Sequence, residues 1–198
     1  IDEAAHPKVG MQTSNNEKFL RLWWETDWSP TQNDSNHKWI KYLKGGKYRK
    51  WNGNLEYLLF YNNDPNYILE QPHARVLPLE MLRKPKITCT MLTSGRPGFR
   101  SAPEDSFYDI AAHCCFPKEP QFNYILGLLN SSLSALCLSA QNPTMNMQVS
   151  DIASVPYVEG DPKSVSKVSG IVAESSDISK IDWDSFETSW DFKRHPLL

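Results

Sequence analysis

With 198 residues, of which 40% are hydrophobic, and with seven Trp, eight Tyr and eight Phe, the chain can bury the core of one good-sized domain. This composition excludes a chain that is disordered throughout. The formal net charge is only −2, but residues 36–100 hold twelve Lys or Arg against four Asp or Glu, whereas residues 101–198 hold six against thirteen. A middle third this basic predicts contact with a polyanion, although a solvated Lys-rich surface, or an interface with the chain's own acidic third, would show the same charges.

The N-terminus and the cysteines indicate what kind of chain this is. Residues 1–10, IDEAAHPKVG, have neither an initiator Met nor a basic region followed by an apolar one, so we expect a piece of a longer protein. The longest apolar run, at residues 124–138, is interrupted by Gly127, Asn130 and three Ser, so we expect no membrane span. The four cysteines form no CxxC and have no His at zinc-ligand spacing. We therefore expect them reduced, with the adjacent Cys114 and Cys115 in a strand, and the protein in the cytoplasm.

The first half of the chain predicts short strands separated by polar turns. A Gly/Ser/Asn turn precedes KFLRLWWE, residues 18–25, which alternates well enough to be a strand. After a polar loop at 29–38, the segment 38–51 predicts a short element, a turn at Gly45 and Gly46, and a second short strand. The turn at 52–54 follows, and residues 55–61 fit either a strand or a turn of helix.

The second half predicts further strands and one clear helix. Pro78 and Pro85 bound a short helix at residues 79–83, and a strand at 86–92 leads into a Gly/Pro/Arg loop at 93–100. Residues 106–117 lean toward β structure. Apolar residues recur at helical spacing across 121–141, and 145–158 is expected to be extended. From residue 159 the composition becomes acidic.

These elements predict an α+β fold. We expect a mixed, mostly antiparallel sheet of short strands backed by the one long helix at 121–141. We further expect a division into a recognition domain at 1–158 and a less regular, acidic, aromatic-containing extension at 159–198.

A segment rich in both cations and aromatic residues, KYLKGGKYRKWNGN at 41–54, is the first candidate site. Lysine recurs every third residue from Lys38 to Lys50, and no carboxylate lies between Asp34 and Glu56. Lys and Arg neutralise phosphates, and Gly45 and Gly46 would let backbone amides approach them closely. The predicted phosphate contacts are Lys44, Lys47, Arg49 and Lys50. A hairpin with its lysines facing solvent is the alternative.

Reading a base requires side chains with paired donors or acceptors, because Arg can grip guanine and Asn adenine in the major groove. The loop at 93–100 is attractive because Gly95 and Gly98 would let its two arginines project, although either could instead pair with Glu104 or Asp105. Trp51 is the one tryptophan predicted to stack on a base, since most Trp residues pack in cores. The predicted base-reading residues are Arg49, Asn52, Asn54, Arg96 and Arg100.

Two other groups of residues carry weaker predictions. His37, His73 and His113 lack the spacing of metal ligands, so no metal site is expected. The segment DWDSFETSWDF at 182–192 places four aromatic residues among carboxylates and predicts a short amphipathic anchor that docks back on the parent protein.

Four blocks, in order along the chain, resemble the target recognition region of PglX-type adenine-specific DNA methyltransferases of bacterial phage-exclusion (BREX) and related restriction-modification systems. Residues 10–25 resemble its opening, although Ser14 stands where Gly is usual. Residues 44–54 resemble its Gly-Gly, Arg-Lys-Trp, Gly-Asn block, 124–157 the helix and docking strand that close it, and 182–198 the segment just beyond. The matching positions in the first block are Gly10, Thr13, Asn15 or Asn16, and Phe19.

The resemblance implies a DNA sequence recognition region that binds duplex DNA. The expected partners are double-stranded DNA, the catalytic methyltransferase domain of the same chain and other subunits of the defence system. The chain shows no Gly-rich loop for S-adenosylmethionine and no Asn/Asp-Pro-Pro-aromatic motif, since NPTM at 142–145 departs from it. S-adenosylmethionine and methyl transfer are thus implied for the parent enzyme, with no catalytic residue and no cofactor expected in this fragment.

A protein–protein interaction module that binds an acidic partner within a defence complex is the alternative function. An independent hydrolase is a poor third hypothesis, because the motifs assemble no nucleophile, base and orienting residue.

Overall fold

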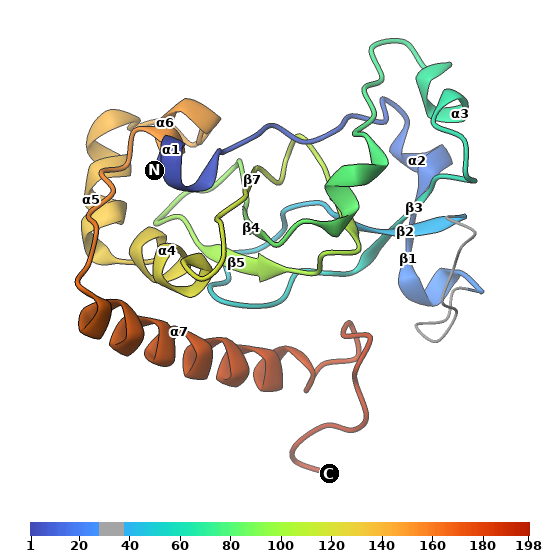
Figure 1. Ribbon diagram of the computed structural model, residues 1–198. Coiled ribbons are helices and arrows are strands. Elements are labelled where there is room, and N and C mark those ends of the chain that lie inside the picture. The colour runs from blue at the N-terminus through green and yellow to red at the C-terminus, as the bar shows by residue number, and fades with distance from the viewer. Residues whose placement is uncertain (28–37) are drawn as a thin grey trace.

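The computed structural model describes residues 1–27 and 38–198. Two small sheets lie at the centre, and the predicted α+β class, with mixed and antiparallel sheets of short strands, is confirmed. Helices α1 (Asp2–Ala5), α4 (Phe122–Leu129), α5 (Ser132–Gln141) and α6 (Val149–Ala153) gather at one end of the molecule (Figure 1). Helices α2 (Asn16–Phe19) and α3 (Asn66–Leu69) lie at the other end.

The first sheet is mixed and has the strand order β1-β3-β2-β6. Strands β1 (Leu20–Leu22) and β2 (Trp39–Leu43) each pair antiparallel with β3 (Tyr57–Phe60), whereas β6 (Ser106–Tyr108) runs parallel to β2. The buried faces of these strands pack with Met11, Phe19 and Ile68 into one core cluster. The segment at 55–61, whose sequence fitted either a strand or a turn of helix, therefore contains a strand.

The strand predicted at 18–25 is shorter than expected because both of its ends are helical. Asn15 caps α2, its side chain accepting a hydrogen bond from the Lys18 amide at 3.0 Å, so the extended backbone begins only at Leu20. The 3₁₀ helix η1 (Trp23–Glu25) ends it, and the Glu25 carboxylate accepts a hydrogen bond from the Leu22 amide at 2.9 Å.

The second sheet is antiparallel, with the order β5-β4-β7, and comprises β5 (Phe99–Ala102), β4 (Lys86–Cys89) and β7 (Cys114–Cys115). The vicinal cysteines lie in a strand, as predicted, and are buried and free of disulfides. Burial raises the pKa of the Cys114 thiol to about 12, so this thiol is protonated and packs as an apolar group. The short helix predicted at 79–83 is the 3₁₀ helix η2 (Leu79–Arg83).

The prediction of a single helix at 121–141 is wrong, because two helices, α4 and α5, occupy this segment and meet at an angle of 58°. Ser131 caps the start of α5, its hydroxyl accepting a hydrogen bond from the Ser134 amide at 3.1 Å. Within the described residues no single helix is long and apolar enough to cross a bilayer, and α4 and α5 reach that length only when counted together across their bend.

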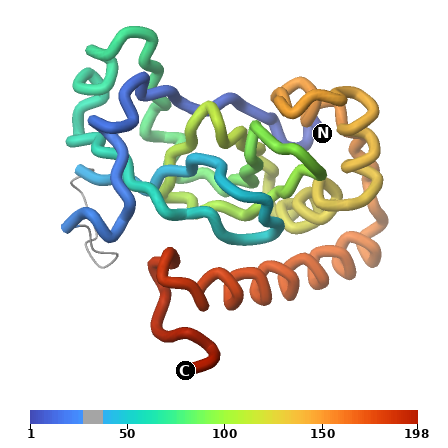
Figure 2. The backbone as a smooth tube through the Cα atoms, turned by 180° about the vertical axis from the view of Figure 1, so that it is seen from behind, coloured from blue at the N-terminus to red at the C-terminus, as the bar shows by residue number. Residues whose placement is uncertain are grey.

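The extension expected to be less regular contains the longest helix, α7 (Pro162–Trp183). Asp161 caps it by accepting hydrogen bonds from the Lys163 and Ser164 amides, and Pro162 occupies its first turn. The extended segment expected at 145–158 also contains a helix, α6. Helix α7 runs along one side of the molecule, against α4 (Figure 2). The end of α7 and the residues after it, 179–198, are here called the C-terminal segment, which reaches the first sheet at Trp23, the residue after β1. The division of the chain after residue 158 stays a prediction.

Candidate nucleic-acid interface

Two loops that the sequence singled out separately lie side by side. Residues 44–54, here called the basic loop, contact the second sheet through Trp51, whose amide donates to the Phe99 carbonyl at 2.9 Å and whose carbonyl accepts from the Ser101 amide at 2.9 Å. The neighbouring loop at 93–98 passes so close that a Cβ on Gly98 would lie 2.5 Å from the Arg49 carbonyl oxygen. The candidate cations of both loops therefore share one region of the surface.

The Gly-Gly turn has a positive-φ backbone, as a tight turn requires. Gly45 and Gly46 have φ values of 85° and 100°. Gly45 is buried, and a Cβ there would lie 2.8 Å from the Ala111 carbonyl, whereas Gly46 is exposed. Only the second glycine thus leaves its backbone open to a ligand. Residues 47–50 do not form the second short strand that was expected after this turn, and within the basic loop Trp51 alone bridges to β5.

Lys47 and Arg96 are the exposed cations of these two loops. Neither side chain has a hydrogen bond or ion pair with any part of the chain that the structure describes. Partial burial lowers the pKa of Lys50, and the nearby positive charge of Arg96 lowers it further, so Arg96 lies within electrostatic reach of Lys50. This region is where the two loops concentrate positive charge.

The other predicted phosphate contacts are bound within the chain. The Lys44 ammonium contacts the buried Asp109 carboxylate at 2.7 Å. Arg49 pairs with Asp182 at 2.7 Å, and its guanidinium lies 5.0 Å from the centre of the Trp183 ring. The Lys50 ammonium donates to the Asn130 carbonyl at 2.8 Å. The first two charges are thus partly neutralised inside the molecule.

The expectation that Arg100 projects from a loop is wrong. Arg100 lies on β5 and is 1% exposed, and its guanidinium donates to the Arg49 carbonyl at 3.1 Å and to the Thr90 hydroxyl at 3.3 Å. Its side chain therefore cannot reach a base in this structure. The alternative pairing with Glu104 or Asp105 is not formed either. Arg100 holds the basic loop against the second sheet.

The three remaining predicted residues, Trp51, Asn52 and Asn54, are all partly buried in the basic loop. Trp51 has a φ of 70° and packs against the core below the second sheet. The Asn54 side chain donates to the Lys47 carbonyl at 2.7 Å, and the Asn52 carbonyl accepts from the Ser179 hydroxyl at 3.3 Å. These contacts shape the loop and leave part of each side chain accessible.

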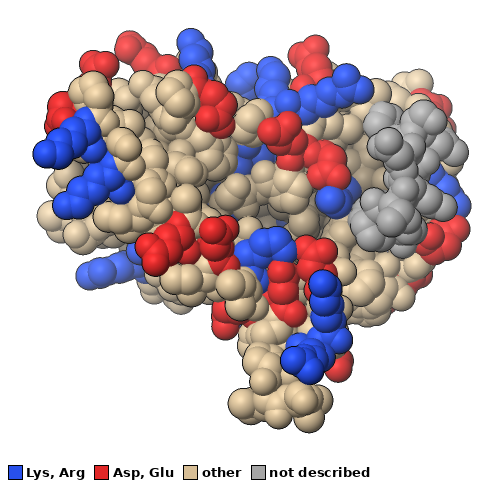
Figure 3. All heavy atoms as spheres, turned by 60° about the horizontal axis from the view of Figure 1, so that its bottom comes forward, with Lys and Arg blue, Asp and Glu red and all other residues tan. Residues whose placement is uncertain are grey.

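The C-terminal segment docks on the basic loop. The Ser179 hydroxyl donates to the Lys50 carbonyl at 3.0 Å, and the Trp190 indole donates to the Leu55 carbonyl. In return, the Trp23 indole donates to the Thr188 carbonyl at 3.0 Å. The basic third of the chain thus lies partly against the acidic third, one of the two alternatives that its charge pattern allowed. Figure 3 shows both signs of charge interspersed over this face.

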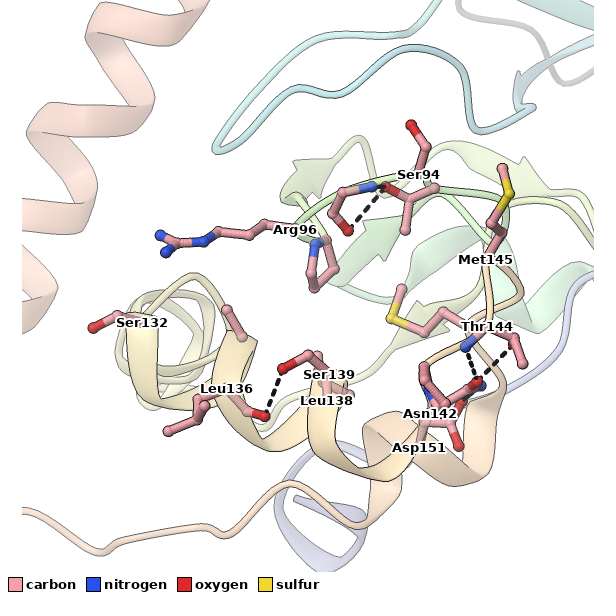
Figure 4. A pocket seen from close by; sticks show the side chains of 16 residues that line it. Ser94, Arg96, Ser132, Leu136, Leu138, Ser139, Asn142, Thr144, Met145 and Asp151 are labelled. Atoms are coloured by element: carbon pink, nitrogen blue, oxygen red, sulfur yellow. Dashed lines mark hydrogen bonds between the residues drawn. The ribbon is translucent and has the colours of Figure 1, made fainter.

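A pocket of about 370 Å³ opens beside the 93–98 loop, between it, α5 and residues 142–147 (Figure 4). Leu136 and Met145 border it and are 66% and 57% exposed. Arg96 points away from Asn142, toward the end of the pocket where Ser132 lies. The pocket therefore offers apolar surface with a cation at one end.

The NPTM segment does not fit an adenine-holding motif. The Asn142 amide donates to the Asn146 carbonyl at 2.8 Å and to Asp151 at 2.6 Å, while its oxygen accepts from the Thr144 amide at 2.9 Å. These bonds occupy the groups that would hold the adenine amine.

No group of three or more His, Cys, Asp or Glu side chains able to hold a metal ion occurs in residues 1–27 and 38–198. His113 is buried with neither ring nitrogen hydrogen-bonded, and burial lowers its pKa. His37 lies outside the described residues.

Sequence reasoning missed several residues that build this region. They include Tyr48, which is 60% exposed in the basic loop, and Asn130, Ser179 and Asp182, which bind that loop. The pattern NSS at 130–132 was the available signal for a helix break, since Asn and Ser favour helix ends.

Comparison with known proteins gives the class. No protein-family model matches the chain. Two similar proteins are both adenine-specific methyltransferases, and the chain spans only about one sixth of the length of each. One is the adenine-specific methyltransferase BrxX of Escherichia coli O9:H4 (strain HS), 29% identical over 195 residues, which are 96% of this chain and 16% of that protein. The other is the adenine-specific methyltransferase PglX of Lacticaseibacillus casei (strain Zhang), 27% identical over 207 residues, 96% of this chain and 17% of that protein. The chain is therefore a fragment of the PglX/BrxX type, as its sequence blocks predicted.

Proposed function

We propose that this chain is the DNA target recognition region of an adenine-specific, S-adenosylmethionine-dependent DNA methyltransferase of a BREX or restriction-modification system. It binds duplex DNA and presents it to a catalytic domain elsewhere in the same polypeptide. The observation that carries the proposal is the meeting of two loops, each with an exposed cation, in a chain similar over 96% of its length to adenine-specific methyltransferases.

Lys47 and Arg96 make the principal contacts in this proposal, because both side chains are exposed and neither forms a hydrogen bond or an ion pair within the described residues. Lys47 neutralises a phosphate, and Arg96 has the paired donors that can grip a guanine or a phosphate. Lys50, Asn52 and Asn54 contribute through their accessible parts, whereas Lys44, Arg49 and Trp51 support the loop. Arg100 is left out of the contact set because it is buried.

The proposal is tested by measuring the dissociation constant for duplex DNA at several salt concentrations, using the intact protein that carries this chain. Each phosphate contact adds about −0.9 to the slope of log K against log salt, so Lys47→Ala weakens binding and makes this slope less steep by about 0.9. Lys163→Ala, at an exposed lysine of α7, is the matched control and leaves both unchanged. Duplex binding that does not depend on salt, or that is equal in Lys47→Ala, Arg96→Ala and the control, contradicts the proposal.

The specificity part of the proposal has its own readout. Sequencing the methylated adenines of cells that carry Arg96→Ala reports whether the pattern of modified sites broadens or modification is simply lost. A broadened pattern identifies Arg96 as a base-reading residue, whereas a uniform loss assigns it to the phosphate backbone.

A protein-binding module is the second candidate function, and the pocket beside α5 favours it. Its exposed Leu136 and Met145 lie next to a cation, a combination that suits an apolar side chain followed by a carboxylate on an acidic partner. Under this function Leu136→Asp abolishes binding of another purified subunit of the defence system and leaves duplex binding intact. Under the first function the variant has no effect on subunit binding.

A further inference from the structure

A second hollow, of about 740 Å³, separates the basic loop from the C-terminal segment. Its walls come from residues 44–57 on one side and from residues 183–195 on the other. The volume lies within the range of about 300–1,000 Å³ that is typical of small-molecule sites. Lys47 and Asn54, two of the proposed duplex contacts, line this hollow, but they do not account for its aromatic lining.

Two aromatic rings line the hollow and remain largely exposed. Tyr48, from the basic loop, is 60% exposed, and Phe186, from the C-terminal segment, is 48% exposed. Trp183 also lines it but is 8% exposed, because its ring packs against Gly53 and Arg49. Tyr48 and Phe186 thus offer apolar planar surface that the fold does not use, as stacking platforms for nucleobases do.

The cations that line the hollow differ in whether they are paired within the chain. Lys44 and Arg49 are paired with Asp109 and Asp182, whereas the Lys47 ammonium forms no ion pair or hydrogen bond among the described residues and acts on Glu56 only from a greater distance. Lys47 is therefore the cation left to meet a phosphate in this hollow.

Glu56 supplies a carboxylate on the same wall. It is half-buried and makes no hydrogen bond or ion pair through its side chain within residues 1–27 and 38–198. Burial raises its pKa, and the charge of Lys47 opposes that rise. A carboxylate that is partly desolvated and unpaired is suited to accept a hydrogen bond from an amino group, as Glu does from the exocyclic amine of cytosine.

We propose that this hollow is a nucleotide-binding site for an unstacked base of single-stranded or locally opened DNA. The base stacks on Tyr48 and Phe186, its exocyclic amino group donates to Glu56, and the adjoining phosphate meets Lys47. Bases with an exocyclic amino group, which are cytosine, adenine and guanine, therefore bind better than thymine, which has none. This inference rests on the proposed function only in assuming that the ligand is DNA. The ligand here is an unpaired strand, and two of the residues that bind it are aromatic residues that take no part in the proposed duplex contacts.

The test measures binding of fluorescein-labelled 12-nucleotide oligomers of dC and of dT to the intact protein that carries this chain. Wild type binds the dC oligomer more tightly than the dT oligomer. Tyr48→Ala and Phe186→Ala each weaken binding of both oligomers about tenfold, because stacking is worth about 1–3 kcal/mol per base. Tyr48→Phe, which keeps the ring, retains wild-type affinity. Glu56→Gln reduces the preference for dC over dT, because an amide accepts hydrogen bonds less strongly than a carboxylate.

Two controls separate this site from general effects. Trp24→Ala removes an aromatic ring that is 46% exposed but does not line the hollow, and it leaves oligomer binding unchanged. Equal unfolding midpoints of wild type, Tyr48→Ala and Phe186→Ala show that a loss of binding is not a loss of fold.

Wild-type oligomer binding in both Tyr48→Ala and Phe186→Ala overturns the inference, as does a dC preference that Glu56→Gln leaves intact. If Arg96→Ala weakens duplex binding while the aromatic variants bind single strands normally, the inference fails and the proposed function stands. If the protein binds no duplex but loses single-strand binding in Tyr48→Ala, the proposed function fails and the inference stands.

Discussion

Asn130 connects three parts of the protein. Its side-chain oxygen accepts from the Phe99 amide at 3.0 Å and its side-chain nitrogen donates to the Phe99 carbonyl at 2.9 Å, so the amide group bonds the edge of β5 as a neighbouring strand would. Its own carbonyl accepts from Lys50 of the basic loop at 2.8 Å. The sequence did not reveal this role, because a partner 31 residues earlier leaves no trace in the pattern around Asn130.

Arg100 and Arg96 differ in burial although they lie four residues apart. We expect Arg100→Ala to lower the free energy of unfolding by about 2–4 kcal/mol, because it strips buried carbonyl and hydroxyl acceptors of their donor and leaves a cavity. Arg96→Ala, the matched control, changes it by less than about 0.5 kcal/mol, since Arg96 is exposed. Urea unfolding measures both, and equal effects of the two substitutions would contradict the structural role of Arg100.

Lys86 is a fully buried lysine. Its ammonium donates to the carbonyls of Pro103 at 3.2 Å, Glu104 at 2.8 Å and Ser106 at 3.0 Å. Burial disfavours its charged form and lowers its pKa to about 8. The three carbonyl acceptors oppose this effect by favouring the ammonium. The connection between β5 and β6 is thus organised around one titratable group.

Lys86 makes stability depend on pH in the alkaline range. The folded pKa, about 8, lies below the usual lysine value of 10.5, so between these values the unfolded chain binds more protons and the free energy of unfolding rises with pH. The rise is at most about 3 kcal/mol, from 1.36 kcal/mol per pKa unit. Below pH 8 both states are protonated and this group contributes no slope.

The prediction is a difference between variants. Urea unfolding of wild type and Lys86→Met from pH 7 to 10 yields a stability difference that grows in favour of wild type as pH rises. Lys84→Met, at the exposed lysine two residues earlier, shows a constant difference. A constant difference for Lys86→Met as well would exclude a lowered pKa for Lys86.

At the scale of elements, α4 and α7 pack closely because Gly127 has no side chain. A Cβ at Gly127 would lie 2.8 Å from a methyl carbon of Val172 and 3.0 Å from one of Val168. The side chains of α7 that meet Gly127 are those of Val168 and Val172. The position of α7 thus depends on one glycine.

Gly127→Ala should destabilise the protein by about 1–3 kcal/mol, although Ala is the better helix former, because the added methyl forces the two helices apart. Gly170→Ala, in α7, is the matched control, since nothing lies within 4 Å of its Cβ position. That substitution should stabilise the protein by up to about 1 kcal/mol. Thermal unfolding of the two variants tests the packing, and stabilisation by both substitutions would show that the helices are not in close contact.

Local sequence patterns predicted the elements whose structure depends mainly on residues that are close together in the sequence. The strand β4 and the helix between Pro78 and Pro85 agree with the prediction, β2 is the short element expected before the Gly-Gly turn, and β3 is one of the two structures that residues 55–61 fitted. The break between α4 and α5 was missed because apolar spacing continues across Asn130, while the bonds of that residue to Phe99 direct α5 away. Helix α7 was missed because its Ser- and Val-rich sequence has low helix propensity, and its packing against α4 compensates for that.

At the scale of the whole molecule, Trp183 joins the C-terminal segment to the basic loop. Its ring lies against Gly53, where a Cβ would be 3.1 Å from a ring carbon, and beneath the Arg49 guanidinium. Gly53 has a φ of 111°, so both the backbone conformation and the contact require glycine there. The C-terminal segment therefore acts as a support for the basic loop.

Trp183→Ala removes this support. We expect a loss of about 3–5 kcal/mol in the free energy of unfolding and faster hydrogen exchange of the amides at 49–54. Ile181→Ala, at a residue of the same helix that is 72% exposed, leaves exchange in the basic loop unchanged. Unaltered exchange at 49–54 in Trp183→Ala would show that the loop is held by the second sheet alone.

The sequence by itself determined the α+β class, the short strands, the reduced cysteines in β7 and the relation to PglX-type methyltransferases, because these depend on local composition and on the order of motifs along the chain. Only the tertiary structure decided which cations stay exposed. Arg100, Arg49 and Lys44 had the same local signals as Lys47 and Arg96, yet partners between 10 and 133 residues away bind the first three. Burial and ion pairing are set by residues distant in sequence, so a charged residue's neighbours along the chain do not reveal whether its charge is free.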